Sequence, residues 1–169
     1  MKSRFLVLLS IISIVLSFSA CNLGNGFSEA TPQIYLEKKA KLNTDSIIEF
    51  SLASDYSSYK LDTLHVGDTV SFKIFVDAYT NQVKQLNITP SDTTAVKLLV
   101  ADSIKTEFLS QSDFNKGIFY LPPNVYGLEF SVKFTTRKAK ETLSYTLNVT
   151  SDAKKVTNVS EVKIQFPIK

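Results

Sequence analysis

The feature that most limits what this chain can fold into is the regular alternation of apolar and polar residues. Between Tyr126 and Phe134, five apolar residues occupy every second position without interruption. Shorter runs of the same kind cover residues 70–76, 143–149 and 162–166. Successive side chains of a β-strand point to opposite faces, so alternation of this length predicts half-buried antiparallel strands.

Shorter strand candidates lie between these runs and are separated by residues typical of turns. They cover residues 33–37, 46–52, 83–89, 96–100, 105–109 and 118–121. Glycine, proline, asparagine and aspartate gather in the intervening segments. No segment carries a convincing helical stripe, and residues 35–42 come nearest to one. Strands at this spacing predict a single all-β domain over residues 32–169, folded as an antiparallel β-sandwich.

The first 20 residues follow a different pattern. Lys2 and Arg4 precede 16 uncharged residues that are rich in Leu, Ile and Val and end in Ala20. A cationic start, an apolar centre and small residues before a break form a secretory signal peptide. Sixteen helical residues span only about 24 Å, which is short for a membrane-crossing helix. We therefore predict a helical signal peptide at 1–20, with an uncleaved single-pass anchor as the alternative.

The only cysteine of the chain follows this leader directly. The segment Phe18-Ser19-Ala20-Cys21 resembles the lipobox of bacterial lipoproteins, in the form found in Bacteroidetes. This resemblance implies cleavage before Cys21, a diacylglyceryl thioether with palmitate-like acyl chains, and a location in the cell envelope, at the outer membrane. Two or three acyl chains anchor a protein stably, unlike a single chain. The alternative is a lone buried cysteine at the end of an uncleaved helix.

Residues 21–31 lack apolar periodicity and are predicted to form a flexible tether from the lipidated Cys21. About ten residues reach at most about 33 Å, so the domain is expected close to its membrane. In some lipoproteins of the Bacteroidetes type, an acidic cluster after the cysteine marks export to the cell surface. Residues 22–26 carry no charge, so periplasmic and surface-facing orientations both stay open.

Charge gives no support to nucleic-acid binding. The leader holds two of the 19 basic residues and none of the 16 acidic ones, so its removal lowers the net charge from +3 to about +1. Two basic runs remain, at residues 37–41 and 137–141. We expect solvated turns at both, and the alternative is contact with anionic lipid or glycan.

Residues suited to catalysis or metal binding are scarce. His65 is the only histidine, the lone thiol is assigned to lipid, and no phosphate-binding glycine loop occurs. His65 lies just before a Gly-Asp turn, where an exposed histidine is common. We therefore predict no enzyme activity, no cofactor and no metal. A small hydrolase is the alternative, and it requires two carboxylates about 5–10 Å apart in a pocket.

Aromatic residues provide candidates for ligand binding. Tyr56 and Tyr59 lie three positions apart in a polar stretch, where their rings could form a ligand platform for a glycan. The alternative is that they cover the edge of the sandwich. Tyr126 and Tyr145 fit the core pattern. Phe75 and Phe27 occupy positions expected to face water, where one of them is a candidate for a partner surface; the alternative for each is a packing detail.

Five of the nine aspartates are followed by Ser or Thr and then a third residue. These triplets resemble the O-glycosylation signal of extracytoplasmic Bacteroidetes proteins. The resemblance implies glycans on Ser46, Thr63, Thr69, Thr93 and Ser103. The alternative is local turn chemistry, in which Asp accepts backbone hydrogen bonds and the following residues begin a strand.

Residues 64–72, Leu-His-Val-Gly-Asp-Thr-Val-Ser-Phe, resemble the early-strand turn of bacterial immunoglobulin-like domains. The resemblance implies an immunoglobulin-like form of the sandwich. The sequence therefore predicts a lipid-anchored, non-catalytic envelope protein that serves as a binding or structural accessory for a protein or glycan partner. The alternative binding function is a glycan-binding module of a nutrient-uptake system.

Overall fold

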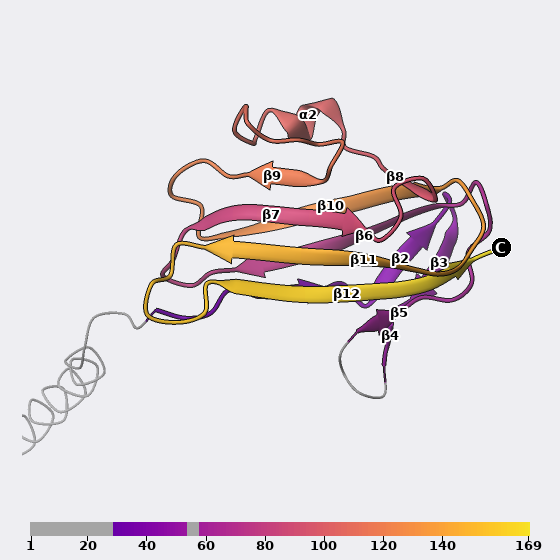
Figure 1. The fold of residues 1–169 in the computed structure, drawn as a ribbon, viewed down its shortest axis with the longest axis horizontal. Helices are drawn as coiled ribbons and strands as arrows, with labels where there is room; N and C mark the ends of the chain where they lie inside the picture. The colour runs from indigo at the N-terminus through magenta and orange to yellow at the C-terminus, as the bar shows by residue number, and fades with distance from the viewer. Residues whose placement is uncertain (1–28, 54–57) are drawn as a thin grey trace, which may run out of the picture.

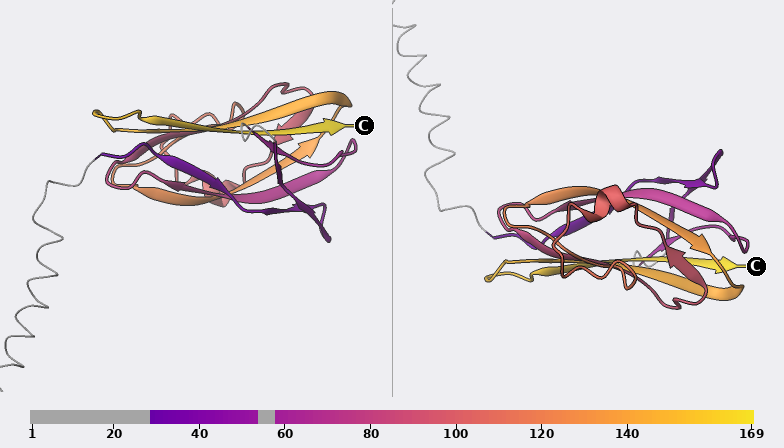
Figure 2. Two further views of the ribbon diagram at one scale, coloured as in Figure 1. Left: turned by 90° about the horizontal axis from the view of Figure 1, so that it is seen from below. Right: turned by 90° about the horizontal axis from the view of Figure 1, so that it is seen from above.

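The computed structural model describes residues 29–53 and 58–169 of the chain. Within this part the protein is almost entirely β-structure, and its strands form two sheets that pack face to face (Figures 1 and 2). The predicted antiparallel, immunoglobulin-like β-sandwich is confirmed. The predicted signal helix, Cys21, Phe27 and Tyr56 lie outside the described residues. In the described ranges, no helix has the length and apolar character needed to cross a membrane.

The first sheet, which we call sheet A, has six strands and is antiparallel throughout. Its strands follow the order β3-β2-β6-β10-β8, and β1 pairs with the part of β6 that β2 leaves open. The strands are β1 (Gln33–Leu36), β2 (Lys39–Leu42), β3 (Ser46–Glu49), β6 (Thr69–Asp77), β8 (Val96–Leu98) and β10 (Gly127–Thr136).

The second sheet, sheet B, also has six strands, in the order β4-β5-β12-β11-β7-β9. Its pairings are antiparallel except for a short parallel contact between β5 and β12. The strands are β4 (Ser51–Leu52), β5 (Tyr59–Lys60), β7 (Val83–Pro90), β9 (Ile118–Tyr120), β11 (Lys140–Ser151) and β12 (Val159–Ile168).

The core lies between the inner faces of the two sheets. Phe134 of β10 stacks on Phe166 of β12 with ring centroids 5.3 Å apart, so aromatic contacts join the sheets directly. Full burial of one such side chain contributes about 1.5–3 kcal/mol. The largest fully buried side chains are Tyr145, Phe119, Phe134, Phe166, Leu64, Ile74, Leu86, Ile88, Leu143, Leu147, Ile164 and Val70.

The predicted strand at residues 46–52 is divided between the two sheets. β3 belongs to sheet A and β4 to sheet B, with Phe50 between them. The Phe50 ring packs edge-on against Phe72, at 5.1 Å, and against Tyr59, at 6.3 Å. The partly buried Phe50 ring thus packs against the core at the point where the chain passes from sheet A to sheet B.

The predicted strand at residues 105–109 is wrong. The short helix α2 (Asp102–Lys105) occupies the start of this segment, and turns follow it. Phe108 packs against Phe119 and Phe130, with ring centroids 5.2 and 5.8 Å apart. The connection from β8 to β9 therefore crosses one edge of the sandwich (Figure 1) and fills it with aromatic side chains.

Two other expectations need correction. Residues 37–41 were expected to form a solvated turn, and 35–42 showed the nearest approach to a helical stripe. Instead β1 and β2 lie along β6 in succession. Tyr126 was expected in the core but is 45% exposed, because β10 begins only at Gly127.

Candidate functional site

The outer face of sheet A carries exposed aromatic side chains, which is the surface feature that most needs an explanation. Tyr35 of β1 and Phe75 of β6 are direct cross-strand partners. Their side chains point away from the core and are 50% and 40% exposed. Phe75 had been expected on a wet face, and its exposure is confirmed. Adjacent aromatic side chains on a strand pair stabilise the sheet only modestly, by about 0.2–1 kcal/mol.

Tyr79 adds a third ring to this surface. It is 46% exposed, and its hydroxyl lies 3.5 Å from the hydroxyl of Tyr35. The backbone φ of Tyr79 is +56°, a left-handed conformation that is unfavourable for a bulky residue. The Asp77 carboxylate holds this conformation by accepting the Tyr79 N–H at 2.7 Å. We call Tyr35, Phe75 and Tyr79 the aromatic patch.

A groove crosses the same face next to the aromatic patch. It has a volume of about 450 Å³ and is lined mainly by β2, β6 and β10. In one cross-strand row, Lys41 lies opposite Ser71, which in turn lies opposite Lys133. We call the hollow around Lys41, Ser71, Ser131 and Lys133 the lysine groove.

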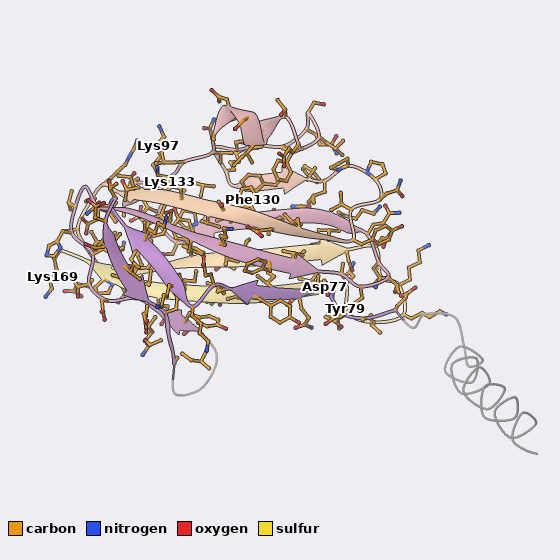
Figure 3. The ribbon with its side chains drawn as sticks, turned by 180° about the vertical axis from the view of Figure 1, so that it is seen from behind. Asp77, Tyr79, Lys97, Phe130, Lys133 and Lys169 are labelled. Carbon is orange, nitrogen blue, oxygen red and sulfur yellow. The ribbon has the colours of Figure 1, made fainter. Side chains whose placement is uncertain are left out.

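A second hollow of about 460 Å³ continues on the far side of β10 and shares Ser131 and Lys133 with the first. Lys97 of β8 and Lys105 of α2 also line it, together with the Phe114 ring. Figure 3 shows Lys97 and Lys133 at one end of sheet A, and Asp77 and Tyr79 at the other. The lysine-rich surface and the aromatic patch therefore lie along one face.

Other lysines of this face are neutralised by carboxylates. Lys73 donates to Glu129, which raises the pKa of Lys73 above its ordinary value. Lys39 pairs with Glu49 at 3.8 Å. In the part of the chain that the structure describes, no carboxylate lies within 4.0 Å of the Lys41, Lys97 or Lys133 ammonium groups.

The predicted ligand platform at Tyr56 and Tyr59 is described only in part. Tyr56 lies outside the described residues. Tyr59 belongs to β5 and is half-buried, with its ring against Phe50. The ligand platform at this pair stays a prediction.

The five candidate O-glycosylation residues lie in different settings. Ser46, Thr63, Thr93 and Ser103 are exposed. Thr69 is half-buried in β6, where its hydroxyl lies 3.1 Å from that of Thr135. Glycosylation at these positions stays a prediction.

Two aspartates of these triplets also perform the turn chemistry expected of them. Asp92 accepts the backbone and side-chain donors of Thr94, and Asp68 accepts the His65 N–H. The Thr94 hydroxyl and then Lys140 hold the pKa of Asp92 well below its usual range. The turn interpretation therefore has structural support at these two positions.

Residues that could perform catalysis do not converge in the described part of the chain. The His65 imidazole is exposed, and its Nδ1 lies 3.8 Å from the Asp68 carboxylate. In residues 29–53 and 58–169, no three residues of the His, Cys, Asp and Glu types are grouped to hold a metal ion. Glu37 is the carboxylate that lines the lysine groove.

The sequence did not identify Tyr35 and Tyr79 of the aromatic patch as candidate site residues. Tyr35 alternates with the inward-facing Ile34 and Leu36, and this pattern was sufficient to place it outside. Tyr79 gave no such signal, because it follows the end of β6 and meets Tyr35 only through the β1–β6 register.

Comparison with known proteins gives a distant likeness in fold. No protein-family model matches the chain, and no curated protein matches its sequence. Among solved structures, the part of native alpha-2-macroglobulin from Escherichia coli that runs from domain MG7 to the C-terminus matches with a TM-score of 0.41 and 9% identity, over 84% of this chain and 17% of that one.

Two further structures show the same kind of similarity. Domains 4 and 5 of the S-layer protein SbsC match at a TM-score of 0.34 and 17% identity, over 80% of this chain and 46% of that one. The N-terminal domain of PorA matches at 0.36 and 15%, over 77% of this chain and 97% of that one. The chain thus spans less than half the length of the first two, and none of the three indicates what it binds.

Proposed function

We propose that this chain is a lipid-anchored, non-catalytic envelope protein that binds a protein or glycan partner through the outer face of sheet A. The observation that carries the proposal is the aromatic patch. Three exposed aromatic rings on one face expose apolar surface to water, and such surface typically marks an interaction site. The strained backbone at Tyr79 supports the same conclusion, because strain of this kind concentrates at functional sites.

The anchor in this proposal rests on the leader and on the lipobox-like segment before Cys21. The non-catalytic role in this proposal rests on the sequence, which holds a single histidine. In the described residues, His65 is exposed at a turn, with its Nδ1 3.8 Å from the Asp68 carboxylate. A sandwich face can bind a partner without reactive groups, because loops and flat faces supply the contacts.

A glycan partner is favoured by one specific observation within this proposal. Tyr35 and Tyr79 meet at their hydroxyls, which leaves two aromatic rings and two polar groups at the surface. Sugar rings pack on aromatic faces and hydrogen bond at their edges. A glycan-binding module of a nutrient-uptake system is therefore the second candidate function.

Photo-cross-linking in intact cells tests the proposed face. A photoreactive phenylalanine replaces Phe75 in one strain and Thr146 in another, because Thr146 lies on the outer side of sheet B, between β7 and β12. We expect a discrete cross-linked product from position 75 only. A loss of its added mass on glycosidase treatment identifies a glycan, and peptides of a second protein in its mass spectrum identify a protein. Equal products from both positions, or none from position 75, contradict the proposal.

A further inference from the structure

We propose that the lysine groove binds a linear anionic glycan, that is, a saccharide chain with carboxylate or phosphate groups. This inference rests on the proposed function and specifies the partner's chemistry. The row Lys41–Ser71–Lys133 carries it, because two lysines flank a serine across three adjacent strands. Neighbouring strands lie about 4.8 Å apart, so the Cα atoms of the two lysines lie about 10 Å apart.

The two lysines lack the local neutralisation that their neighbours have. Lys73 forms an ion pair with Glu129, and Lys39 forms one with Glu49, so carboxylates of the same sheet neutralise these two charges. Among the described residues, Lys41 and Lys133 have no carboxylate within ion-pair distance. Glu37 also lines the groove, and with Lys39 and Lys73 paired, Lys41 and Lys133 leave it with a small net positive charge. Charge complementarity therefore selects an anionic occupant.

Protection of a sheet edge does not explain these lysines. Proteins often place lysine on edge strands to prevent strand-to-strand aggregation. Lys41 and Lys133 instead lie on β2 and β10, which are interior strands of sheet A.

The form of the surface favours a chain of sugars over a single small anion. The lysine groove and the second hollow share Ser131 and Lys133, and together they extend from Ile47 of β3 to α2. Lys97 adds a further positive charge in the second hollow. Ser71 and Ser131 provide hydroxyls on the floor, and the aromatic patch lies further along the same face (Figure 3).

Binding measurements with the full chain in detergent test the inference. The probe is oligogalacturonate, a linear glycan with one carboxylate per sugar, and its methyl-esterified form is the neutral control. We expect the esterified form to bind at least about tenfold more weakly, and added salt to weaken binding of the charged form.

A double variant, Lys41→Ser with Lys133→Ser, is expected to lose about tenfold in affinity for oligogalacturonate. The matched control is Lys84→Ser with Lys163→Ser, which removes the same charge from exposed lysines of sheet B. Equal losses in the two double variants overturn the inference, since net charge alone would then explain binding. Binding of the esterified form as tightly as the charged form also overturns it.

Inorganic phosphate and vesicles containing phosphatidylglycerol distinguish other sources of the same charge. Tighter binding of phosphate than of oligogalacturonate would assign the groove to a small anion, and the inference would fail. Because the proposed anchor itself binds vesicles, a lipid surface is assigned, and the inference likewise fails, if the Lys41→Ser with Lys133→Ser variant weakens binding to the vesicles more than it weakens binding to oligogalacturonate. The proposed function is judged separately. If position 75 still cross-links a partner while oligogalacturonate does not bind, the anionic-glycan inference fails and the proposed face stands.

Discussion

Among the described residues, Tyr145 has the largest fully buried side chain. The residue is 1% exposed, and the described residues offer the hydroxyl no hydrogen-bond partner. Burial raises the pKa of Tyr145 far above its usual range, so the phenol stays neutral. The ring itself packs well, 4.8 Å from Phe134 and 6.4 Å from Phe166.

Removal of this hydroxyl is expected to stabilise the protein. A buried, unpaired hydroxyl costs about 1–3 kcal/mol of desolvation, and Tyr145→Phe keeps the ring while it removes that cost. We expect the free energy of unfolding to rise by about 1 kcal/mol, measured by urea denaturation. Tyr145→Leu is the control, because it loses ring contacts and should destabilise. A lower stability for Tyr145→Phe would show that the hydroxyl has a partner in solution.

Gly117 precedes β9 and occupies a position that other residues cannot adopt without a shift of the backbone. Its φ is +70°, and an added Cβ would lie 2.1 Å from the carbonyl oxygen of Ile88. Its own carbonyl accepts the Ile88 N–H at 2.8 Å, which ties this turn to β7. Gly67 also has positive φ, +94°, but an added Cβ there would meet no atom within 4 Å.

Alanine substitutions at the two glycines therefore distinguish the cost of a left-handed backbone from the additional cost of a steric clash. Gly67→Ala is expected to cost about 1–2 kcal/mol, the price of a left-handed residue with a side chain. Gly117→Ala should cost more, because β7 and the turn must also move apart. Thermal unfolding of both variants measures the difference. Equal melting temperatures for the two would show that the turn at Gly117 relaxes freely.

At the scale of elements, the turn before β6 shows how side chains determine where a strand begins. Asp68 accepts the His65 N–H at 2.8 Å and the Asn43 side-chain amide at 3.0 Å. The side-chain Oδ1 of Asn43 in turn accepts the Thr69 N–H at 2.9 Å. Asp68 thus joins the β2–β3 turn to the first residue of β6.

This contact is expected to make stability depend on acid. Partial burial raises the pKa of Asp68, but the hydrogen bonds from His65 and Asn43 lower it by more, so the pKa lies below its ordinary value of 3.8. A depressed pKa in the folded state contributes stability above the unfolded-state pKa, and this stability is lost as the pH falls. We expect the unfolding free energy to decrease below about pH 4.

Asp68→Asn should make this decrease shallower, because one carboxylate that prefers the folded state is removed. Urea midpoints measured from neutral pH to about pH 3 provide the test. Asp45→Asn is the matched control, since Asp45 is exposed in the neighbouring β2–β3 turn. The explanation is wrong if both variants retain the full acid dependence of the original chain.

The elements also show what alternation can predict and where it stops. β6, β10, β11 and β12 were predicted because one face of each is buried along its length. β2 was missed because its inward residues, Ala40 and Leu42, alternate with lysines that resemble a solvated run. The segment 105–109 was wrongly predicted as a strand because Phe108 packs against Phe119 and Phe130 from a loop, and the local pattern does not distinguish a loop from a strand.

The candidate site was less predictable than the fold for a related reason. A strand pattern shows that Phe75 faces outward, but it does not show which strand lies beside it. The neighbours of Phe75 are Tyr35 and Glu129, and both come from the pairing register. The same holds for the lysine groove. Lys41 and Lys133 are 92 positions apart in the chain, and the strand register places them on either side of Ser71.

At the scale of the whole molecule, the first described residues lie at the end of the sandwich that holds the β11–β12 turn. The Glu29 carboxylate accepts the Lys155 N–H at 2.6 Å and also that of Lys154, both in the β11–β12 turn. The Lys155 and Lys154 N–H groups lower the pKa of Glu29, so it is charged at neutral pH. Lys97, Lys133 and the C-terminal Lys169 lie toward the other end (Figure 3).

This placement gives the proposed anchor a geometric consequence. Cys21 precedes Glu29 by eight residues, which reach at most about 27 Å when extended. A lipid on Cys21 would therefore hold the β11–β12 end near the membrane and leave the lysine groove toward the far end. The proposed glycan would then be met on the side of the domain away from its own bilayer.

Intact mass of the protein extracted from membranes tests the anchor. We expect a chain that begins at Cys21 and carries the mass of a thioether-linked lipid, because two or three acyl chains are required for stable attachment. Cys21→Ser should lack this mass and either keep the leader or leave the membrane fraction. Mass beyond the lipid would support glycans on exposed residues such as Thr63 and Thr93. A protein that retains residues 1–20 without lipid would instead make the leader a membrane helix, and the proposed lipid anchor would be wrong.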